Sequence, residues 1–408
     1  MKLTKKEKSW LLYDIAASAF TMIISTTVPL YFAQIAETAS IDGAVVTGIY
    51  GTATAIAVLI LALLSPILGA IADYKGMKKT MFTISLILAI FCMISFTISN
   101  TWVLFIIFFI GARLCYAACN IFYDSMLTDV TEDERMDELS SFGYAFGYIG
   151  SCIPFIVGIV LIFINDFELI GFRLSFIVTA IWWCIFAIPL IKNVEHRHYI
   201  ERDEHIVKNA FKRLRVTLGK IKTNKKFFFF IIAYFCYIDG VYTVISMATS
   251  YGAEVGIDTI SLILALLVTQ FVAFPCAIMS GKLGKKFGAI KLIKIFIYIY
   301  FFTCIFGFQL DKAWEFWVLA VVVGMAQGGI QALSRSYFAK QIPKEESNEY
   351  FGFFDIFGRF ADFFGPLVIA FSAFVFKTSK YGILFLAVFF LVGYILLRKV
   401  EKLEDSAK

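Results

Sequence analysis

Histidine is scarce in this chain, and none of its three histidines (His196, His198 and His205) falls inside a long apolar stretch. The eight cysteines show the opposite bias, since all lie within apolar segments and no two form a Cys-x-x-Cys pair. This distribution excludes both the ligand spacing of a zinc site and the framework of a disulfide-rich domain. The sequence therefore predicts buried free thiols and no metal site.

Catalytic motifs are missing as well. The chain has no His-Glu-x-x-His or Gly-x-Ser-x-Gly string, and no Gly-x-x-x-x-Gly-Lys-Ser/Thr phosphate loop. We therefore expect no enzymatic activity, no cofactor and no ATP-driven pumping by this chain alone. Lys and Arg sit in short loops between apolar stretches, which also argues against nucleic acid as a partner.

Apolar residues, in contrast, are abundant. They make up 60% of the chain and raise its mean hydropathy to +0.81, whereas soluble domains are about 45–50% apolar. A helix needs about 20 apolar residues to cross a bilayer. Twelve stretches are long enough, at residues 9–36, 45–72, 79–99, 102–128, 137–165, 170–191, 226–251, 258–281, 287–309, 314–340, 347–376 and 380–399. The sequence predicts an all-α membrane protein with twelve transmembrane helices.

The basic residues give these helices an orientation. Thirty of the 37 Lys and Arg residues fall in one set of alternate loops, which includes both ends of the chain, and four fall in the other set. Positive loops stay on the cytoplasmic side. We therefore expect both termini in the cytoplasm, and the first apolar stretch is too long for a cleaved signal peptide.

Two halves of the chain resemble each other. The segment Gly69–Gly76 precedes Gly281–Gly288 by 212 residues, and Glu132 precedes Glu345 by 213. Such a constant offset indicates duplication of a six-helix unit. We predict an N-terminal bundle at 1–192, a basic amphipathic linker at 193–225 and a C-terminal bundle at 226–408. The linker is expected to form a helix that lies on the membrane surface, or else a solvated connection, and its apolar face contains Val207, Phe211, Leu214, Leu218 and Ile221. Two parallel six-helix halves are the organisation of major facilitator transporters.

Polar residues inside the spans recur at helical spacing, which places them on one face of each helix. The faces belong to the first and fourth spans of each half: Asp14, Ser18, Thr21 and Ser25; Arg113, Tyr116, Asn120 and Asp124; Asp239, Tyr242 and Ser246; and Gln327, Gln331 and Arg335. Charge at membrane depth costs about 2.5–3.5 kcal/mol on insertion scales. These faces are expected to line a wet cavity for substrate or ion. The alternative is that the polar groups only join neighbouring helices by hydrogen bonds.

The chemistry of these faces suits a zwitterionic solute, with guanidinium groups for its carboxylate and aspartates for its ammonium. The eleventh span carries Asp355, Arg359 and Asp362 at spacings of four and three. A same-helix ion pair is one interpretation. The other is coupling or gating, because one guanidinium cannot neutralise two carboxylates and one of them could bind a proton.

The loop after the second span resembles the signature loop of the major facilitator superfamily. Gly69, Asp73, Gly76, Lys78 and Lys79 match that pattern, whereas Tyr74 and Met77 stand where arginine is usual. The resemblance implies that these five residues latch the cytoplasmic side in the outward-facing state.

Further strings resemble the autophagy-related vacuole effluxer family and its bacterial relatives. They run in order along both halves, from Trp10–Phe20 through Phe122–Leu127 and Ser140–Gly150 to Gly328–Ser336 and Phe351–Pro366. Asp124 departs from the family, which commonly has Asn there. The resemblance implies a secondary transporter and, for the fungal branch, amino-acid export.

These observations favour a secondary active transporter that moves a small solute by alternating access. Amino-acid efflux and proton coupling are hypotheses, and sugars, drugs or lysolipids remain alternative substrates. A non-transporting receptor or scaffold is the alternative of another class. We expect a monomer in a bacterial plasma membrane, with a small-molecule substrate, H⁺ and membrane lipids as its partners.

Overall fold

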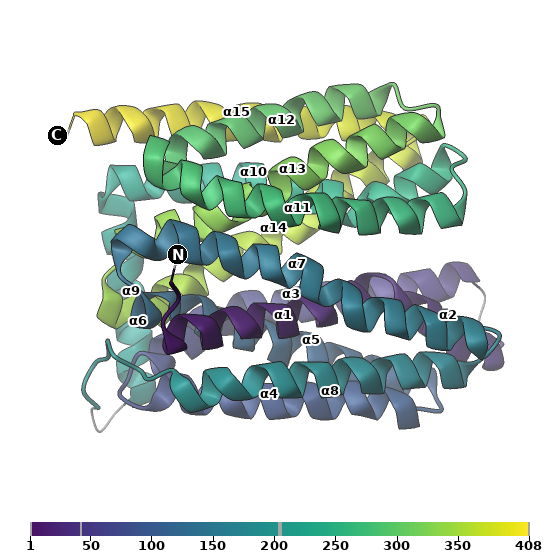
Figure 1. Cartoon of the computed structure of the whole chain (residues 1–408), viewed down its shortest axis with the longest axis horizontal. Coiled ribbons are helices and arrows are strands. Elements are labelled where there is room, and N and C mark those ends of the chain that lie inside the picture. Colours follow the sequence, from purple (N-terminus) through teal and green to yellow (C-terminus); the bar gives the residue numbers. More distant parts are fainter. Residues whose placement is uncertain (1, 41–42, 203–205, 407–408) are drawn as a thin grey trace. The chain divides into compact units, whose positions relative to one another are not determined.

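The structure, a computed structural model, describes residues 2–40, 43–202 and 206–406. Its regular elements are helices, and within these ranges the β-structure is an isolated bridge between Tyr74 and Ile200. The first half contains α1 (Lys5–Ser25), α2 (Thr27–Thr38), α3 (Gly43–Ala72), α4 (Met77–Ser95), η1 (Phe96–Ile98), α5 (Trp102–Ser125), α6 (Leu127–Val130), α7 (Asp133–Ile164) and α8 (Leu169–Asn193). The all-α prediction is confirmed (Figure 1).

The second half repeats this pattern of long helices. It contains α9 (Ile206–Thr223), α10 (Lys225–Glu254), α11 (Thr259–Phe287), α12 (Ala289–Phe308), α13 (Ala313–Gln341), η2 (Lys344–Glu346), α14 (Ser347–Phe376) and α15 (Lys380–Asp405). Among the described residues, 11 helices are long and apolar enough to cross a membrane. The remaining predicted span, 347–376, coincides with α14, in which the shorter stretch Phe364–Phe376 is apolar.

Local chemistry explains several helix boundaries. The Thr4 side chain accepts from Glu7 N–H while the Glu7 side chain accepts from Thr4 N–H, a capping box that starts α1. The first predicted span is divided at Thr26, whose hydroxyl donates to the Met22 carbonyl and so competes with the helix backbone. Gly76 starts α4 with φ of 75°, a conformation that glycine adopts without strain.

The chain divides into two compact units, each of which borrows a short segment from the other half of the sequence. Unit 1 contains residues 1–131, 146–210 and 343–352, and unit 2 contains residues 132–145, 211–342 and 353–408. The beginning of α7 therefore belongs to unit 2, and the beginning of α14 belongs to unit 1. The division predicted at 1–192, 193–225 and 226–408 stays a prediction.

Within unit 1, α1 packs against α8, and α4 packs against α5 and α8 (Figure 1). Within unit 2, α11 packs against α13, and α15 packs against α10 and α12. Large apolar side chains stay exposed along the helices, as expected of a surface that meets lipid. On α4, Ile84, Ile87 and Phe91 are 53%, 61% and 60% exposed.

The predicted basic linker contains α9. Phe211 and Leu218, which we expected on its apolar face, are 53% and 44% exposed, whereas Ala210, Thr217 and Ile221 are buried. The side chain of Val207, expected on the same face, lies outside those that the structure describes. Binding of this helix to a membrane surface stays a prediction.

Candidate functional site

The borrowed segment of α14 is held in unit 1 by Asp73. The Asp73 carboxylate accepts hydrogen bonds from Asn348 N at 2.8 Å, Asn348 Nδ2 at 2.8 Å and Glu349 N at 3.2 Å. The first N–H groups of a helix have no partner within it and attract anions. Asp73 is fully buried, so these bonds form away from water. A carboxylate of the first half thus caps a helix of the second half.

Gly69 permits this contact. A Cβ atom at Gly69 would lie 2.2 Å from the Asn348 carbonyl oxygen and 3.1 Å from the Glu349 Cα, so any side chain would push the helices apart. Gly352 meets α3 in the same way, since its Cβ would lie 2.5 Å from the Ser65 carbonyl oxygen. Glycines at a helix crossing allow such close backbone approach.

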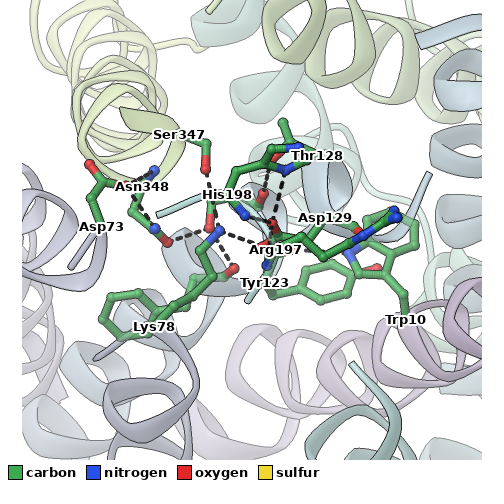
Figure 2. Close-up of polar contacts among 12 residues, drawn as sticks. Trp10, Asp73, Lys78, Tyr123, Thr128, Asp129, Arg197, His198, Ser347 and Asn348 are labelled. Carbon is green, nitrogen blue, oxygen red and sulfur yellow. Dashed lines mark hydrogen bonds and ion pairs between the residues drawn. The ribbon is translucent and has the colours of Figure 1, made fainter. Parts of the chain in front are cut away.

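A buried ion pair lies beside this contact (Figure 2). Lys78 Nζ lies 2.6 Å from Asp129 Oδ2 and 3.3 Å from Ser347 Oγ, and the Lys78 and Asp129 side chains are fully buried. A buried pair stabilises only when its remaining lone pairs and protons are also satisfied. Ser347 satisfies one of the Lys78 protons, and it is the first residue of α14.

Asp129 also holds the segment that follows α8. Its Oδ1 accepts from Arg197 N at 3.1 Å and from His198 N at 3.0 Å, and lies 3.2 Å from His198 Nδ1. Figure 2 shows these groups converging on the same carboxylate. The buried Lys78–Asp129 pair therefore joins α4, the start of α14 and the chain beyond α8.

A second cluster forms in unit 2 around Arg335. Its Nε donates to Ser140 Oγ at 2.9 Å and its Nη2 to the Ser140 carbonyl at 3.1 Å, while the guanidinium carbon lies 4.4 Å from the centre of the Tyr144 ring. Arg335 is 3% exposed. The guanidinium is thus bound to the beginning of α7.

Further polar contacts secure the same segment of α7. Ser336 Oγ donates to Asp137 Oδ1 at 2.6 Å, and Lys340 Nζ lies 2.7 Å from Asp137 Oδ2. On α11, Lys285 Nζ lies 3.5 Å from Glu138 Oε1 and is about half exposed. A Cβ at Gly281 would lie 2.7 Å from the Ser141 Cβ. Gly281 thus repeats in unit 2 the close contact that Gly69 makes in unit 1.

The structure brings the two predicted polar faces of unit 1 together. Thr21 Oγ1 on α1 lies 2.7 Å from Tyr116 Oη on α5. Ser18 faces α7, where a Cβ at Gly147 would lie 2.6 Å from Ser18 Oγ. Asp14 is buried. The four predicted residues of α5 are half-buried: Arg113, Tyr116, Asn120 and Asp124.

The predicted residues of unit 2 are more deeply buried. Asp239 is 1% exposed, and its Oδ1 accepts from Gly365 N at 2.9 Å. Gln327 is 2% exposed and borders an apolar cavity of about 100 Å³ inside this unit. Tyr242 and Gln331 are half-buried. Asp239 thus joins α10 to α14, while the role of these four residues toward a solute stays a prediction.

The predicted coupling residues lie on α14. Asp355 is half-buried, and the side chains of Arg359 and Asp362 lie outside those that the structure describes. Of the five predicted latch residues, Gly69, Asp73 and Lys78 contact the borrowed segment of α14. Gly76 instead begins α4, and Lys79 lines a separate cavity together with Gly76.

Sequence reasoning did not single out Asp129, Asp137, Ser347 or Asn348 as functional residues. Two signals pointed to their neighbourhood: the matching acidic residues Glu132 and Glu345, and the family-like string that begins at Ser140. Neither signal shows that a segment packs in the unit of the opposite half. Only the folded chain shows which helix end each carboxylate contacts.

Comparison with known proteins identifies the family of this chain. A sequence profile described as "Vacuole effluxer Atg22 like" matches residues 3–135 and 128–405. The chain is 43% identical over 410 residues to an MFS-type transporter, YxiO of Bacillus subtilis strain 168, covering 98% of this chain and 96% of that one. The chain belongs to the Atg22-like vacuole effluxer family. It is thus a major facilitator-type transporter, which confirms the resemblance drawn from the sequence.

More distant relatives extend the comparison. Autophagy-related protein 22 of Yarrowia lipolytica is 25% identical over 265 residues, which cover 57% of this chain and 44% of the fungal protein. A structure of the proton:xylose symporter XylE superposes with a TM-score of 0.72 at 12% identity, covering 97% of this chain and 94% of XylE. The transporter FucP in its outward conformation gives a TM-score of 0.72 at 13% identity, covering 96% of this chain and 97% of FucP. These structures confirm the fold class.

Proposed function

We propose that this effluxer-family protein is a secondary active transporter whose change of access requires the two borrowed helix segments to leave their sites. The supporting observation is the buried contact of Asp73 and Lys78 with the beginning of α14. Hydrogen bonds to a charged group contribute about 1.5–3 kcal/mol each. Releasing the segment exposes several such groups at once, so the two access states are separated by a discrete step rather than by gradual deformation.

The solute is a small zwitterion, with amino-acid efflux as the leading case. Arg113 and Asp124 are half-buried on one face of α5, and Thr21 joins that face to α1 through Tyr116. A guanidinium and a carboxylate on one face match the two charges of an amino acid. The more deeply buried Arg335 contacts Ser140 and Tyr144, which favours a gating role for it.

Orientation and coupling belong to the same proposal. The excess of basic residues in one set of loops places both termini in the cytoplasm, in a bacterial plasma membrane. The borrowed segments, which contain Arg135 and Lys344 of this set of loops, then form the cytoplasmic latch of a monomer. Proton coupling stays part of this proposal, with Asp355, Arg359 and Asp362 of α14 as the coupling or gating residues.

Counterflow in proteoliposomes tests the proposal. Liposomes are loaded with a mixture of unlabelled amino acids, and radiolabelled amino acids are added outside in pools. A carrier accumulates label transiently above its equilibrium level, whereas a scaffold gives the uptake of protein-free liposomes. Arg113→Ala and Asp124→Asn are expected to reduce this exchange at least tenfold. Unchanged exchange of every amino acid by both variants would show that Arg113 and Asp124 do not form the solute site.

Sugars are the second candidate class, because proteins of the same fold carry them. A thermal-shift screen of the purified protein against amino acids, dipeptides and sugars separates the classes. A ligand that binds only the folded state raises the melting temperature, by an amount that grows with ligand concentration. Stabilisation by a sugar without any amino-acid response would replace the proposed solute and leave the transport mechanism in place.

A further inference from the structure

A second cavity, of about 620 Å³, lies at the start of α4. The Lys78 side chain is buried in the latch, whereas Lys75 and Lys79 line this cavity. Its lining consists of Lys75, Gly76, Lys79, Thr80, Thr83, Ile84, Glu195, His196 and Tyr199. Because these residues follow one span and precede the next, the cavity lies at a membrane interface. It belongs to unit 1 throughout.

The cavity carries positive charge that is available to a ligand. The Lys79 ammonium makes no hydrogen bond or ion pair within the described part of the chain, although its charge contributes to the lowered pKa of Glu195. Lys75 lies 3.3 Å from Glu201 in an exposed pair, and 4.9 Å from the centre of the Tyr199 ring. Exposed pairs contribute little and exchange partners readily. The Glu195 carboxylate is engaged by Lys6 at 2.7 Å, and this contact lowers its pKa.

His196 adds a neutral polar group to the wall. Both of its ring nitrogens are buried and, within the described residues, neither has a hydrogen-bond partner. Burial, together with the nearby Lys78, lowers the pKa of His196 to about 4. At neutral pH the ring is therefore uncharged, and its buried nitrogens are not accessible from the cavity.

An apolar surface continues from the cavity along α4. Ile84 lines the cavity and is 53% exposed, and further exposed side chains follow it toward the other end of the helix. They are Ile87, Leu88, Phe91, Ile94 and, in η1, Ile98. The site thus combines a basic, hydrogen-bonding end with an adjoining stripe long enough for an acyl chain.

We propose that this cavity binds the headgroup of an anionic phospholipid, whose acyl chain lies along the exposed face of α4. Lys75 and Lys79 contact the phosphate of the headgroup. Basic pockets beside transmembrane helices suit anionic headgroups for this reason. The site lies next to the latch, because Lys79 follows Lys78 directly, and the bound lipid would therefore influence the access states.

Native mass spectrometry of the full-length protein in detergent tests the assignment. Phosphatidylglycerol and phosphatidylcholine of identical acyl chains are titrated against the wild type and against Lys75→Ala/Lys79→Ala. We expect the wild type to retain phosphatidylglycerol preferentially. Removing two cations from the headgroup is expected to weaken its binding about thirtyfold.

The matched control is Lys286→Ala/Lys291→Ala, which removes the same charge from exposed positions of unit 2. Equal losses in the two double variants, or equal retention of both lipids by the wild type, would overturn the site. Glycerol phosphate separates lipid from soluble anion, because displacement of phosphatidylglycerol at equal concentration would assign the cavity to a free organophosphate. If the double variant does not fold, Lys79→Gln alone must still weaken phosphatidylglycerol selectively.

Discussion

The two borrowed segments are held by different chemistry, although they occupy matching places in the duplicated chain. In unit 1, buried Asp73 and buried Lys78 contact the first residues of α14. In unit 2, the residue that corresponds to Asp73 is Lys285, which is about half exposed and lies 3.5 Å from Glu138. Arg335, from α13, supplies the buried charge there instead. The two halves thus share the glycine contacts and differ in where the buried charge lies.

Lys78→Met provides the strongest test of this difference. The substitution leaves the Asp129 carboxylate buried without its cation, and breaking a buried pair in this way costs about 3–5 kcal/mol. The melting temperature in detergent should fall by several degrees. Asp129→Asn in the Lys78→Met background should recover part of the loss, because it removes the uncompensated charge. A melting temperature equal to that of the wild type would show that the pair does not stabilise unit 1.

Arg335→Lys addresses the corresponding charge of unit 2. Lysine keeps the positive charge but cannot reproduce the two directed bonds to Ser140 or the planar contact with Tyr144. We expect a loss of about 1.5–3 kcal/mol, the contribution of hydrogen bonds to a charged group. Chemical denaturation or thermal melting measures it. A loss of less than about 0.5 kcal/mol would show that the positive charge of Arg335 matters and its directed hydrogen bonds do not.

Gly69→Ala breaks the close contact without changing any charge. The added Cβ would meet the Asn348 carbonyl oxygen at 2.2 Å, and relieving such overpacking costs about 1–3 kcal/mol. The α14 segment should detach, which faster labelling of an Asn348→Cys thiol by a maleimide would report. Gly48→Ala in the same helix is the control, since nothing lies within 4 Å of its added Cβ. Equal labelling in both variants would contradict the contact.

His196 makes unit 1 sensitive to pH. Its folded pKa of about 4 lies below the ordinary value of 6.5, so the unfolded chain takes up a proton first as the pH falls. Stability linked to this group is present above pH 6.5 and is lost progressively between pH 6.5 and 4. We expect the melting temperature of lipid-free protein to fall less steeply with decreasing pH across this window for His196→Gln than for the wild type. Parallel slopes for both proteins would place the titration elsewhere.

Lys285→Met should have the smallest effect of the series. The Lys285–Glu138 pair is partly exposed, and such pairs contribute about 0–1 kcal/mol. The melting temperature should therefore change much less than for Lys78→Met, although both substitutions remove one lysine from the matching loops of the two halves. A loss as large as that of Lys78→Met would show that the exposed pair of unit 2 stabilises as much as the buried pair of unit 1.

The fold could be predicted from the sequence because a membrane-spanning segment must form its backbone hydrogen bonds internally, so each long apolar run indicates a helix. It also predicted that Gly69, Asp73 and Lys78 belong together, through the resemblance of one loop. It could not predict their partners. Asn348 lies 275 residues from Asp73, and its backbone N–H carries no sequence signal.

The break of the first span at Thr26 was missed because it involves a local hydrogen bond to Met22, which hydrophobic period does not reveal. The contacts of the two helix beginnings depend instead on tertiary packing, such as the approach of Gly69 to Asn348. The polar faces were found by helical spacing, but spacing did not distinguish half-buried Arg113 from Arg335, which is 3% exposed. Burial depends on the neighbouring helices, which a single helix pattern does not contain.

We propose that this chain is a carrier whose latch opens in every cycle. Counterflow of radiolabelled amino acids in proteoliposomes tests this mechanism, with the wild type and Asp73→Asn compared at equal protein density. The wild type should accumulate label transiently above equilibrium, and the variant should exchange at a different rate. Uptake by the wild type no faster than by protein-free liposomes, for every amino acid, peptide and sugar tried, would show that the chain is not a carrier.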